Sequence, residues 1–167
     1  IEVDILDISL SYSRYWDLGK NTSFAVGLIG FSSWPENQPY DQYFALGRGQ
    51  VLVRGYEQDL IEGNQYVLFK STLRKQLFKY TQDISSVMPF KQFQKVPIAL
   101  YAKVFFDAGY VENYPQYEIS DRLSNSLLHG LGVGLDLVTV YDLVTRFELA
   151  LNAENQLRFA LNARVEF

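Results

Sequence analysis

The sequence contains no cysteine and only one histidine, His129. Without cysteine there is neither a disulfide framework nor a thiolate metal ligand, and one imidazole is too few for a histidine-based metal site. Lys and Arg number 15 against 19 Asp and Glu, so the net charge of -4 lacks the basic excess that nucleic-acid binding requires. We therefore expect no metal, no cofactor and no nucleic-acid partner.

Long apolar runs are also missing from the sequence. No stretch of about 18 apolar residues occurs, which excludes a transmembrane helix, but this test is blind to membrane-spanning strands. No amphipathic helical pattern of useful length is present either. The 167 residues are therefore predicted to form one all-β domain, and the 12 Tyr and 12 Phe are compatible with the aromatic girdles of a membrane barrel.

Alternation of apolar and polar residues predicts about seven strands. The clearest is 155–167, where the apolar positions are Leu157, Phe159, Leu161, Ala163, Val165 and Phe167. It is predicted to form a hairpin with 143–152 across a tight turn. Other strands are expected at 126–137, 98–107 and 66–77, with weaker ones at 22–33 and 5–16. On the polar face of 126–137, three alternating glycines leave room for a bulky group: Gly130, Gly132 and Gly134.

Two architectures fit these strands, a soluble β-sandwich or barrel and an antiparallel transmembrane β-barrel. Both place one strand face in water, so alternation alone does not separate them. Strands of about 10 residues or more exceed the usual soluble length of about 5–6. Large charged side chains also recur on the polar face, which in a membrane barrel lines the wet lumen. They are Lys70, Arg74, Lys103, Arg146, Glu148, Arg158 and Arg164.

The main functional signal lies in a long irregular segment between two predicted strands. It is the tetrapeptide Val53-Arg54-Gly55-Tyr56, which is followed in a later strand by Phe105-Phe106-Asp107-Ala108-Gly109. In this order the two segments resemble the Val-Arg-Gly-aromatic and Phe-x-Asp-x-Gly motifs of the BamA/TamA-type outer-membrane β-barrel assembly proteins. These belong to the superfamily of bacterial surface antigens and two-partner secretion transporters.

The resemblance covers 5–167 and implies the C-terminal strands of a barrel of about 16 strands. The N-terminal strands and the periplasmic domains would lie outside the present sequence. In that family the first motif lies on a long loop that folds back into the barrel, here about 34–63, and the second motif lies on the lumen wall. The sequence begins in mid-alternation at Ile1, without a start methionine or a signal segment, as expected for the later part of a longer chain.

The residues also suggest how the loop would be held. Asp107 shares its strand face with Lys103, so in a barrel its carboxylate points inward and could bind Arg54 through a bidentate pair. Gly55 permits a sharp backbone turn, and Tyr56 can pack on the wall. The residues alone favour a different interpretation, in which Arg54 is a solvated loop residue and Asp107 pairs with Lys103 or ends the strand before Gly109; the resemblance favours the pair of Arg54 and Asp107.

One part of the family pattern is broken. Assembly proteins often supply a second acidic partner for the arginine from the strand just after the loop. The inward positions of that strand are here Lys70, Thr72 and Arg74. We call the predicted pair of Arg54 and Asp107 the latch. Its second acid is therefore missing unless another acidic residue compensates, and the candidates are Glu57, Asp59 and Glu148.

The resemblance implies a non-enzymatic protein of the Gram-negative outer membrane that inserts and folds other barrel proteins. Its partners would be the lipid bilayer, unfolded outer-membrane proteins as clients, and accessory assembly subunits. The last strand would meet the first strand of the complete barrel in a short, weak seam. This seam would act as a lateral gate, at which a client strand can pair with the exposed edge of the last strand. Four of its residues also resemble the C-terminal signal by which outer-membrane proteins are recognised: Phe159, Leu161, Val165 and Phe167.

Other functions stay open at this point. A two-partner secretion transporter would use the same motifs to export one polypeptide, and a soluble β-domain with a binding face would need no membrane. His129 is the one candidate general base, but no serine shares its strand face nearby. An outer-membrane phospholipase is therefore a minor alternative.

Overall fold

The computed structural model describes residues 4–35, 46, 51–83, 95–113, 122–139 and 143–165. They form one antiparallel sheet of seven strands, in which every strand pairs with its neighbours in the chain. The strands are β1 (Leu6–Gly19), β2 (Thr22–Trp34), β3 (Gln65–Asp83), β4 (Lys95–Glu112), β5 (Leu127–Val138), β6 (Leu143–Asn152) and β7 (Leu157–Val165). The all-β prediction is confirmed. Within these ranges, no helix has the length and apolar character needed to cross a bilayer.

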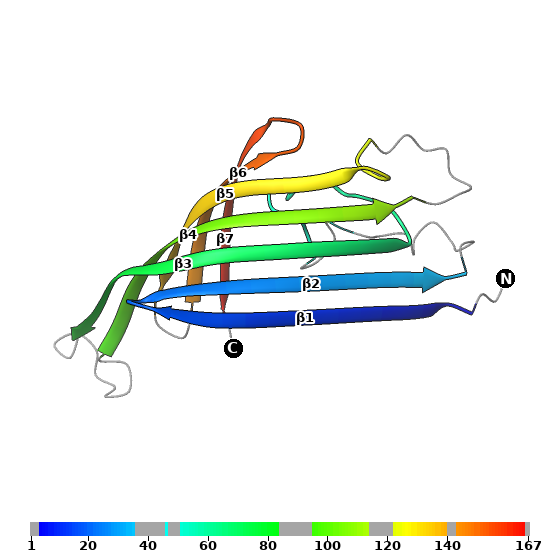
Figure 1. Cartoon of the computed structure of the whole chain (residues 1–167). Coiled ribbons are helices and arrows are strands. Elements are labelled where there is room, and N and C mark those ends of the chain that lie inside the picture. The colour runs from blue at the N-terminus through cyan, green and yellow to red at the C-terminus, as the bar shows by residue number, and fades with distance from the viewer. Residues whose placement is uncertain are drawn as a thin grey trace.

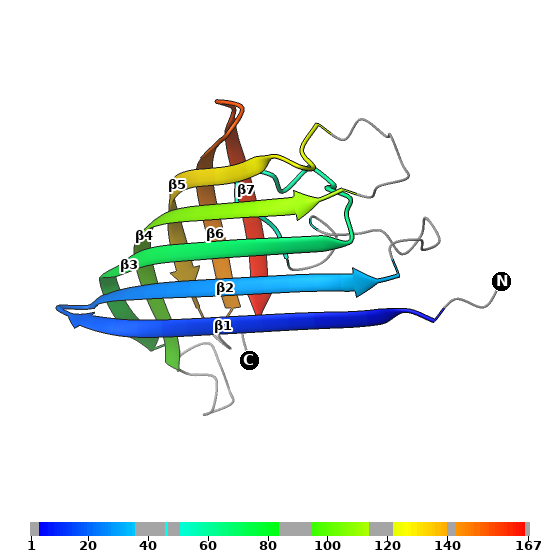
Figure 2. The ribbon, with the colours of Figure 1, turned by 45° about the vertical axis from the view of Figure 1, so that its right-hand side comes forward.

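The sheet is strongly curved (Figures 1 and 2). The long strands β1, β2 and β3 lie side by side, the sheet bends through β4 and β5, and β6 and β7 run behind them. The result is a trough with a concave and a convex face. Within the described residues β1 and β7 each pair with a single strand, so both edges of the sheet are open.

The hairpin of β3 and β4 is longer than the sequence pattern predicts. β2 pairs with β3 only as far as Lys75, and β5 pairs with β4 only from Ala99, so the remainder of this hairpin extends beyond both neighbours. Strict alternation fails at Leu77, because a bulge lies between Gln76 and Phe78. Beyond the bulge, the apolar face continues with Phe78 in place of the position that alternation would assign.

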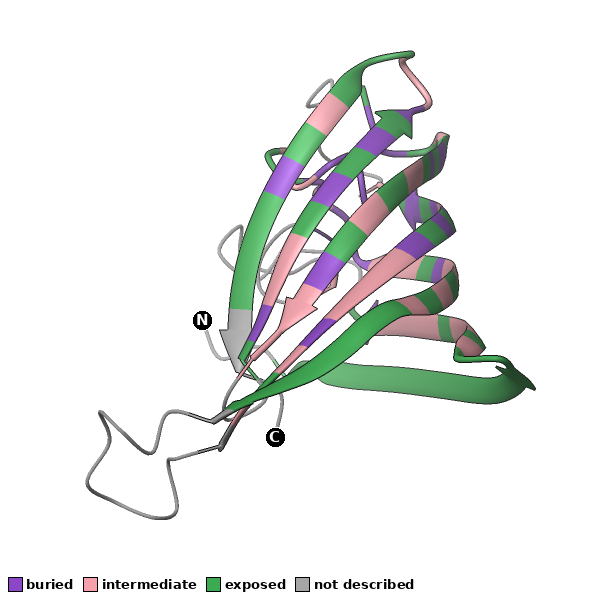
Figure 3. Cartoon of the chain, turned by 90° about the vertical axis from the view of Figure 1, so that its left-hand side faces the viewer, coloured by how far each residue is buried: buried purple, intermediate pink, exposed green. Residues whose placement is uncertain are grey.

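The convex face is apolar over β5, β6 and β7, whereas by the register Arg14, Lys75 and Glu112 also lie on it in β1, β3 and β4. Exposed leucine, valine and phenylalanine side chains cover it, among them Leu73, Val104, Phe106, Leu131, Val133, Leu135, Phe147, Leu149, Phe159 and Leu161. In an antiparallel sheet, directly paired residues share a face. By the register, the described convex positions of β5, β6 and β7 include no Asp, Glu, Lys or Arg. Figure 3 shows buried and exposed bands alternating along the later strands, whereas β1 is exposed throughout.

The hydrophobic core lies on the concave face, under the loop between β2 and β3. Its buried members are Leu46, Val53, Tyr56, Ile61, Leu68, Val111, Leu123 and Leu128. Leu46 and Ile61 exchange two backbone hydrogen bonds of 3.0 Å, which close the loop on itself. Leu128 breaks the alternation of its strand, and the structure explains why. Its side chain faces the concave side, where it packs beneath the loop instead of meeting water.

Candidate functional site: a loop arginine held inside the sheet

The loop turns sharply where it enters the trough. The backbone N–H of Tyr56 donates to the carbonyl of Val53 at 3.1 Å, and Gly55 has a φ of 98°. This left-handed conformation favours glycine. A Cβ at Gly55 would lie in ordinary van der Waals contact with the side chains of Ala150 and Asn152, at 3.4 Å from each. Glycine at this position therefore serves the turn.

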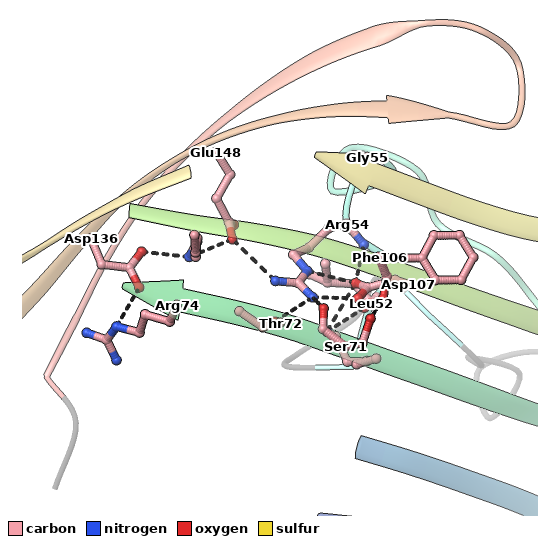
Figure 4. A network of polar contacts seen from close by, with 12 residues as sticks. Leu52, Arg54, Gly55, Ser71, Thr72, Arg74, Phe106, Asp107, Asp136 and Glu148 are labelled. Carbon is pink, nitrogen blue, oxygen red and sulfur yellow. Dashed lines mark hydrogen bonds and ion pairs between the residues drawn. The ribbon is translucent and has the colours of Figure 1, made fainter. Parts of the chain in front are cut away.

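Arg54 and Asp107 form the centre of the site (Figure 4). Arg54 donates from Nε to Asp107 Oδ2 at 2.8 Å and from Nη2 to Oδ1 at 2.5 Å. The backbone N–H of Arg54 adds a third bond to Oδ2, at 3.1 Å. Asp107 has no solvent exposure, and its charge is matched by this bidentate pair. The structure thus brings together the two motifs that the sequence singled out.

Residues of β3 and β4 also contact the guanidinium of Arg54. Nη2 of Arg54 donates to the carbonyl of Ser71 at 3.2 Å and to Thr72 Oγ1 at 3.1 Å. The guanidinium lies over the ring of Phe105, 3.9 Å from its centroid, which is a cation–π contact. Phe105 and Asp107 lie on the same face of β4 and hold the same guanidinium, which explains their spacing in the strand motif.

Lys70, which pairs with Asp107 across the sheet, binds the loop as well. Its ammonium donates to the carbonyl of Leu52 at 2.9 Å and lies 3.8 Å from Oδ2 of Asp107. Lys70 occupies an inward position of β3, where the assembly proteins often carry an acid. Here the position holds a cation that binds the loop backbone directly.

A second acid does approach Arg54, and it comes from β6. Glu148 Oε1 lies 3.8 Å from Arg54 Nη1 and 2.8 Å from Lys103 Nζ. Lys103 in turn lies 2.6 Å from Asp136 Oδ1, and Asp136 Oδ2 lies 3.8 Å from Arg74 Nε. Acids and bases thus alternate across the concave face, and each buried charge has a partner of opposite sign.

Of the three acids considered in the sequence, only Glu148 contacts the guanidinium within the described contacts. Glu57 instead accepts a hydrogen bond of 2.9 Å from the backbone N–H of Gly55. The register shows why Glu148 and Lys103 meet, since both pair with Gly134 of the intervening strand. A lysine and a glutamate on either side of a glycine are recognisable in sequence only when the pairing of three strands is known.

The glycines of β5 provide the space that the sequence predicted. A Cβ at Gly130 would overlap the carbonyl oxygen of Arg54, and one at Gly132 would overlap the ring of Phe105. At Gly134 it would lie 2.7 Å from Cε of Lys103. Gly109 of the strand motif has the same role, because a Cβ there would lie 2.9 Å from Cγ2 of Val53. These glycines leave room for the loop and for the side chains that hold it.

The loop also reaches the hairpin of β6 and β7. The hydroxyl of Tyr56 accepts a hydrogen bond of 3.0 Å from the backbone N–H of Ala153. Nδ2 of Asn152 donates to the carbonyl of Gly55 at 3.3 Å, and Arg158 donates to Gln58 Oε1 at 3.1 Å. Burial raises the pKa of Tyr56 above its usual 10.0, so this phenol stays neutral at ordinary pH. No sequence pattern indicates this role of Asn152.

The other predicted residues lie away from this site. Phe159 and Leu161 are exposed on the convex face of β7. Val165 is the last residue of that strand, and Phe167 lies outside the described residues. His129 is exposed on the convex face of β5, paired across the sheet with Ala108.

Comparisons of the chain with protein-family models, with curated proteins and with solved structures find no match. The resemblance to assembly proteins therefore rests on the two motifs and the C-terminal residues described above. In the structure the two motifs contact one another through the ion pair of Arg54 and Asp107.

Proposed function

We propose that this chain forms the C-terminal part of an outer-membrane β-barrel of about 16 strands, which folds and inserts other barrel proteins through a lateral gate. The observation that carries the proposal is the buried pair of Arg54 and Asp107, which holds a loop inside a curved sheet. Two further properties of the sheet support it: the chemistry of its faces and its open edges.

The faces have the chemistry that a bilayer requires. Charged side chains are paired and buried on the concave side, whereas the convex side of β5 to β7 exposes leucine, valine and phenylalanine. Monomeric soluble proteins rarely expose a contiguous apolar face of this kind. The strands, from 9 residues in β7 to 19 in β3, are comparable to or longer than the approximately 9–11 residues that a tilted membrane strand needs.

The open edges support a closed barrel. Unpaired backbone N–H and C=O groups are costly in hydrocarbon, so a sheet in a bilayer must pair both of its edges. In the described residues β1 and β7 each lack a second neighbour. In our proposal further strands of the same protein complete the wall from β1 towards β7.

The mechanism needs no covalent chemistry. The seam at which β7 meets the first strand of the complete barrel is held by few hydrogen bonds. When it opens, the edge of β7 becomes a template along which a client strand pairs by β-augmentation. The loop anchored through Arg54 braces the wall formed by β3, β4 and β6 while the seam is open. In this mechanism the protein speeds insertion by pairing the client strand with β7 while the anchored loop holds β3, β4 and β6 in place.

The test is reporter-barrel assembly by the full-length protein in lipid vesicles. We expect Arg54→Ala to slow assembly, because the loop loses its attachment to Asp107. The matched control is Arg122→Ala, which removes an exposed ion pair with Glu154 outside the latch. Equal assembly rates for both variants would contradict the proposal.

Two further outcomes separate the alternatives. Export of one polypeptide without assembly of reporter barrels would identify a two-partner secretion transporter. A full-length protein that stays monodisperse in buffer without detergent would be a soluble β-domain, since the convex apolar face could not then be facing lipid.

A further inference from the structure

Two consecutive loop residues bind different strands of the sheet. Arg54 is held by Asp107 of β4, and the carbonyl of Gly55 accepts a hydrogen bond from Asn152 at the end of β6. Asp107 and Asn152 are both register partners of Gly130, in the strand between them. The loop backbone therefore connects β4 to β6 directly across β5.

The connection lies where the sheet bends. β5 is the strand at which the wall turns from β4 towards β6 and β7 (Figures 1 and 2). The loop lies directly on the backbone there, because the carbonyl oxygen of Arg54 fills the place that a Cβ of Gly130 would take. A link that is seated inside a bend and anchored on both sides limits how far that bend can open or close.

One side chain serves both the hairpin and the loop. Oδ1 of Asn152 accepts the backbone N–H groups of Glu154 at 3.1 Å and Gln156 at 2.9 Å, which shapes the turn between β6 and β7. Nδ2 of the same amide donates to Gly55. The hydroxyl of Tyr56 adds a second attachment, to the backbone of the turn. Asn152 is only 2% exposed, so losing either set of bonds leaves a buried polar group without its partner.

We propose that Asn152 and Tyr56 are positioning residues that couple the pair of Arg54 and Asp107 to the hairpin of β6 and β7. Through this coupling the bend at β5, and with it the position of the edge strand β7, depends on whether the loop is latched. The consequence for a lateral gate rests on the proposed function. The coupling itself is a property of the sheet and is measurable without any client protein.

The experiment measures the distance between β3 and β7 by pulsed electron paramagnetic resonance on the full-length protein in lipid. Nitroxides are attached at Leu73→Cys and Phe159→Cys, two exposed convex positions in a chain without cysteine of its own. Asn152→Asp keeps the acceptor oxygen that shapes the turn but faces the carbonyl of Gly55 with a second acceptor. Tyr56→Phe removes only the hydroxyl and keeps the packed ring.

Arg122→Ala is the matched control, because it removes the ion pair with Glu154 on the same hairpin without touching the loop. We expect one narrow distance distribution in the spin-labelled protein without further substitutions and in this control. We expect a broad distribution in the spin-labelled Asn152→Asp and Tyr56→Phe variants. Adding Arg54→Ala to Asn152→Asp should broaden the distribution no further, since either change alone already breaks the link.

Three results would overturn the coupling. The first is a narrow distance in both Asn152→Asp and Tyr56→Phe. The second is broadening by Arg54→Ala that adds fully to that of Asn152→Asp. The third is a lowered melting temperature with the narrow distance intact below the melt, which would indicate a merely structural role. Broadening in a protein that assembles no reporter barrel would contradict the proposed function and leave the coupling standing.

Discussion

Removing Arg54 and Asp107 singly and together gives a quantitative test of the latch. Arg54→Ala deletes two bonds to Asp107 and leaves its carboxylate with a backbone N–H and with Lys70 at 3.8 Å. Asp107→Ala deletes all three bonds and leaves a buried guanidinium whose nearest acid is Glu148, also at 3.8 Å. Breaking a buried pair from one side costs about 3–5 kcal/mol, and we place Asp107→Ala nearer the upper value.

The double variant removes both charges together, so it leaves neither of them stranded. We therefore expect it to be no less stable than Asp107→Ala alone, which corresponds to a coupling free energy of about 3 kcal/mol. The assay is equilibrium unfolding of the full-length protein by denaturant in lipid vesicles, with Arg122→Ala as the surface control. If the free-energy losses of the two single variants simply add, Arg54 and Asp107 do not act as a pair and the reasoning is refuted.

Three other predictions use different parts of the site. Gly130→Ala should displace the loop, because its methyl group would overlap the Arg54 carbonyl, at a cost of about 1–3 kcal/mol in the same unfolding assay; unchanged stability would show that the loop is not seated there. Lys103→Met should destabilise the protein, and adding Glu148→Gln should recover only part of the loss, because the lysine neutralises both Glu148 and Asp136; no recovery in the double variant would count against the charge network. Val133→Arg places a charge on the convex face and should cost about 2–4 kcal/mol if this position is near the bilayer midplane. A neutral effect of Val133→Arg would argue against contact with lipid.

The strands were predictable because they depend on local pattern. Alternation located all seven of them and separated the apolar from the charged face, since period 2 is a property of each strand by itself. It failed where the period changes. The bulge between Gln76 and Phe78 shifts the alternation by one position, and no residue in that stretch predicts a bulge.

The site was predictable only in part. The pairing of Arg54 with Asp107 could be predicted from the motifs and from strand parity. Space for another group at Gly130 could be predicted because glycine has no side chain. Glu148 could be predicted only as one of three candidate acids, and the role of Asn152 could not be predicted at all. Each faces the loop because β6 pairs with β5 in one particular register, and register is set by the whole sheet and not by either strand alone.

The most direct test of the central claim is to trap a client on the edge of β7. A cysteine at Ala160 reports on this strand, and one at Lys79 gives a control on the hairpin extension of β3, away from β7. During assembly of a reporter barrel whose terminal strand carries single cysteines, we predict disulfides to Ala160→Cys in one strand register and none to Lys79→Cys. Equal crosslinking at both positions, or none at Ala160→Cys while the reporter assembles, would contradict a gate at β7.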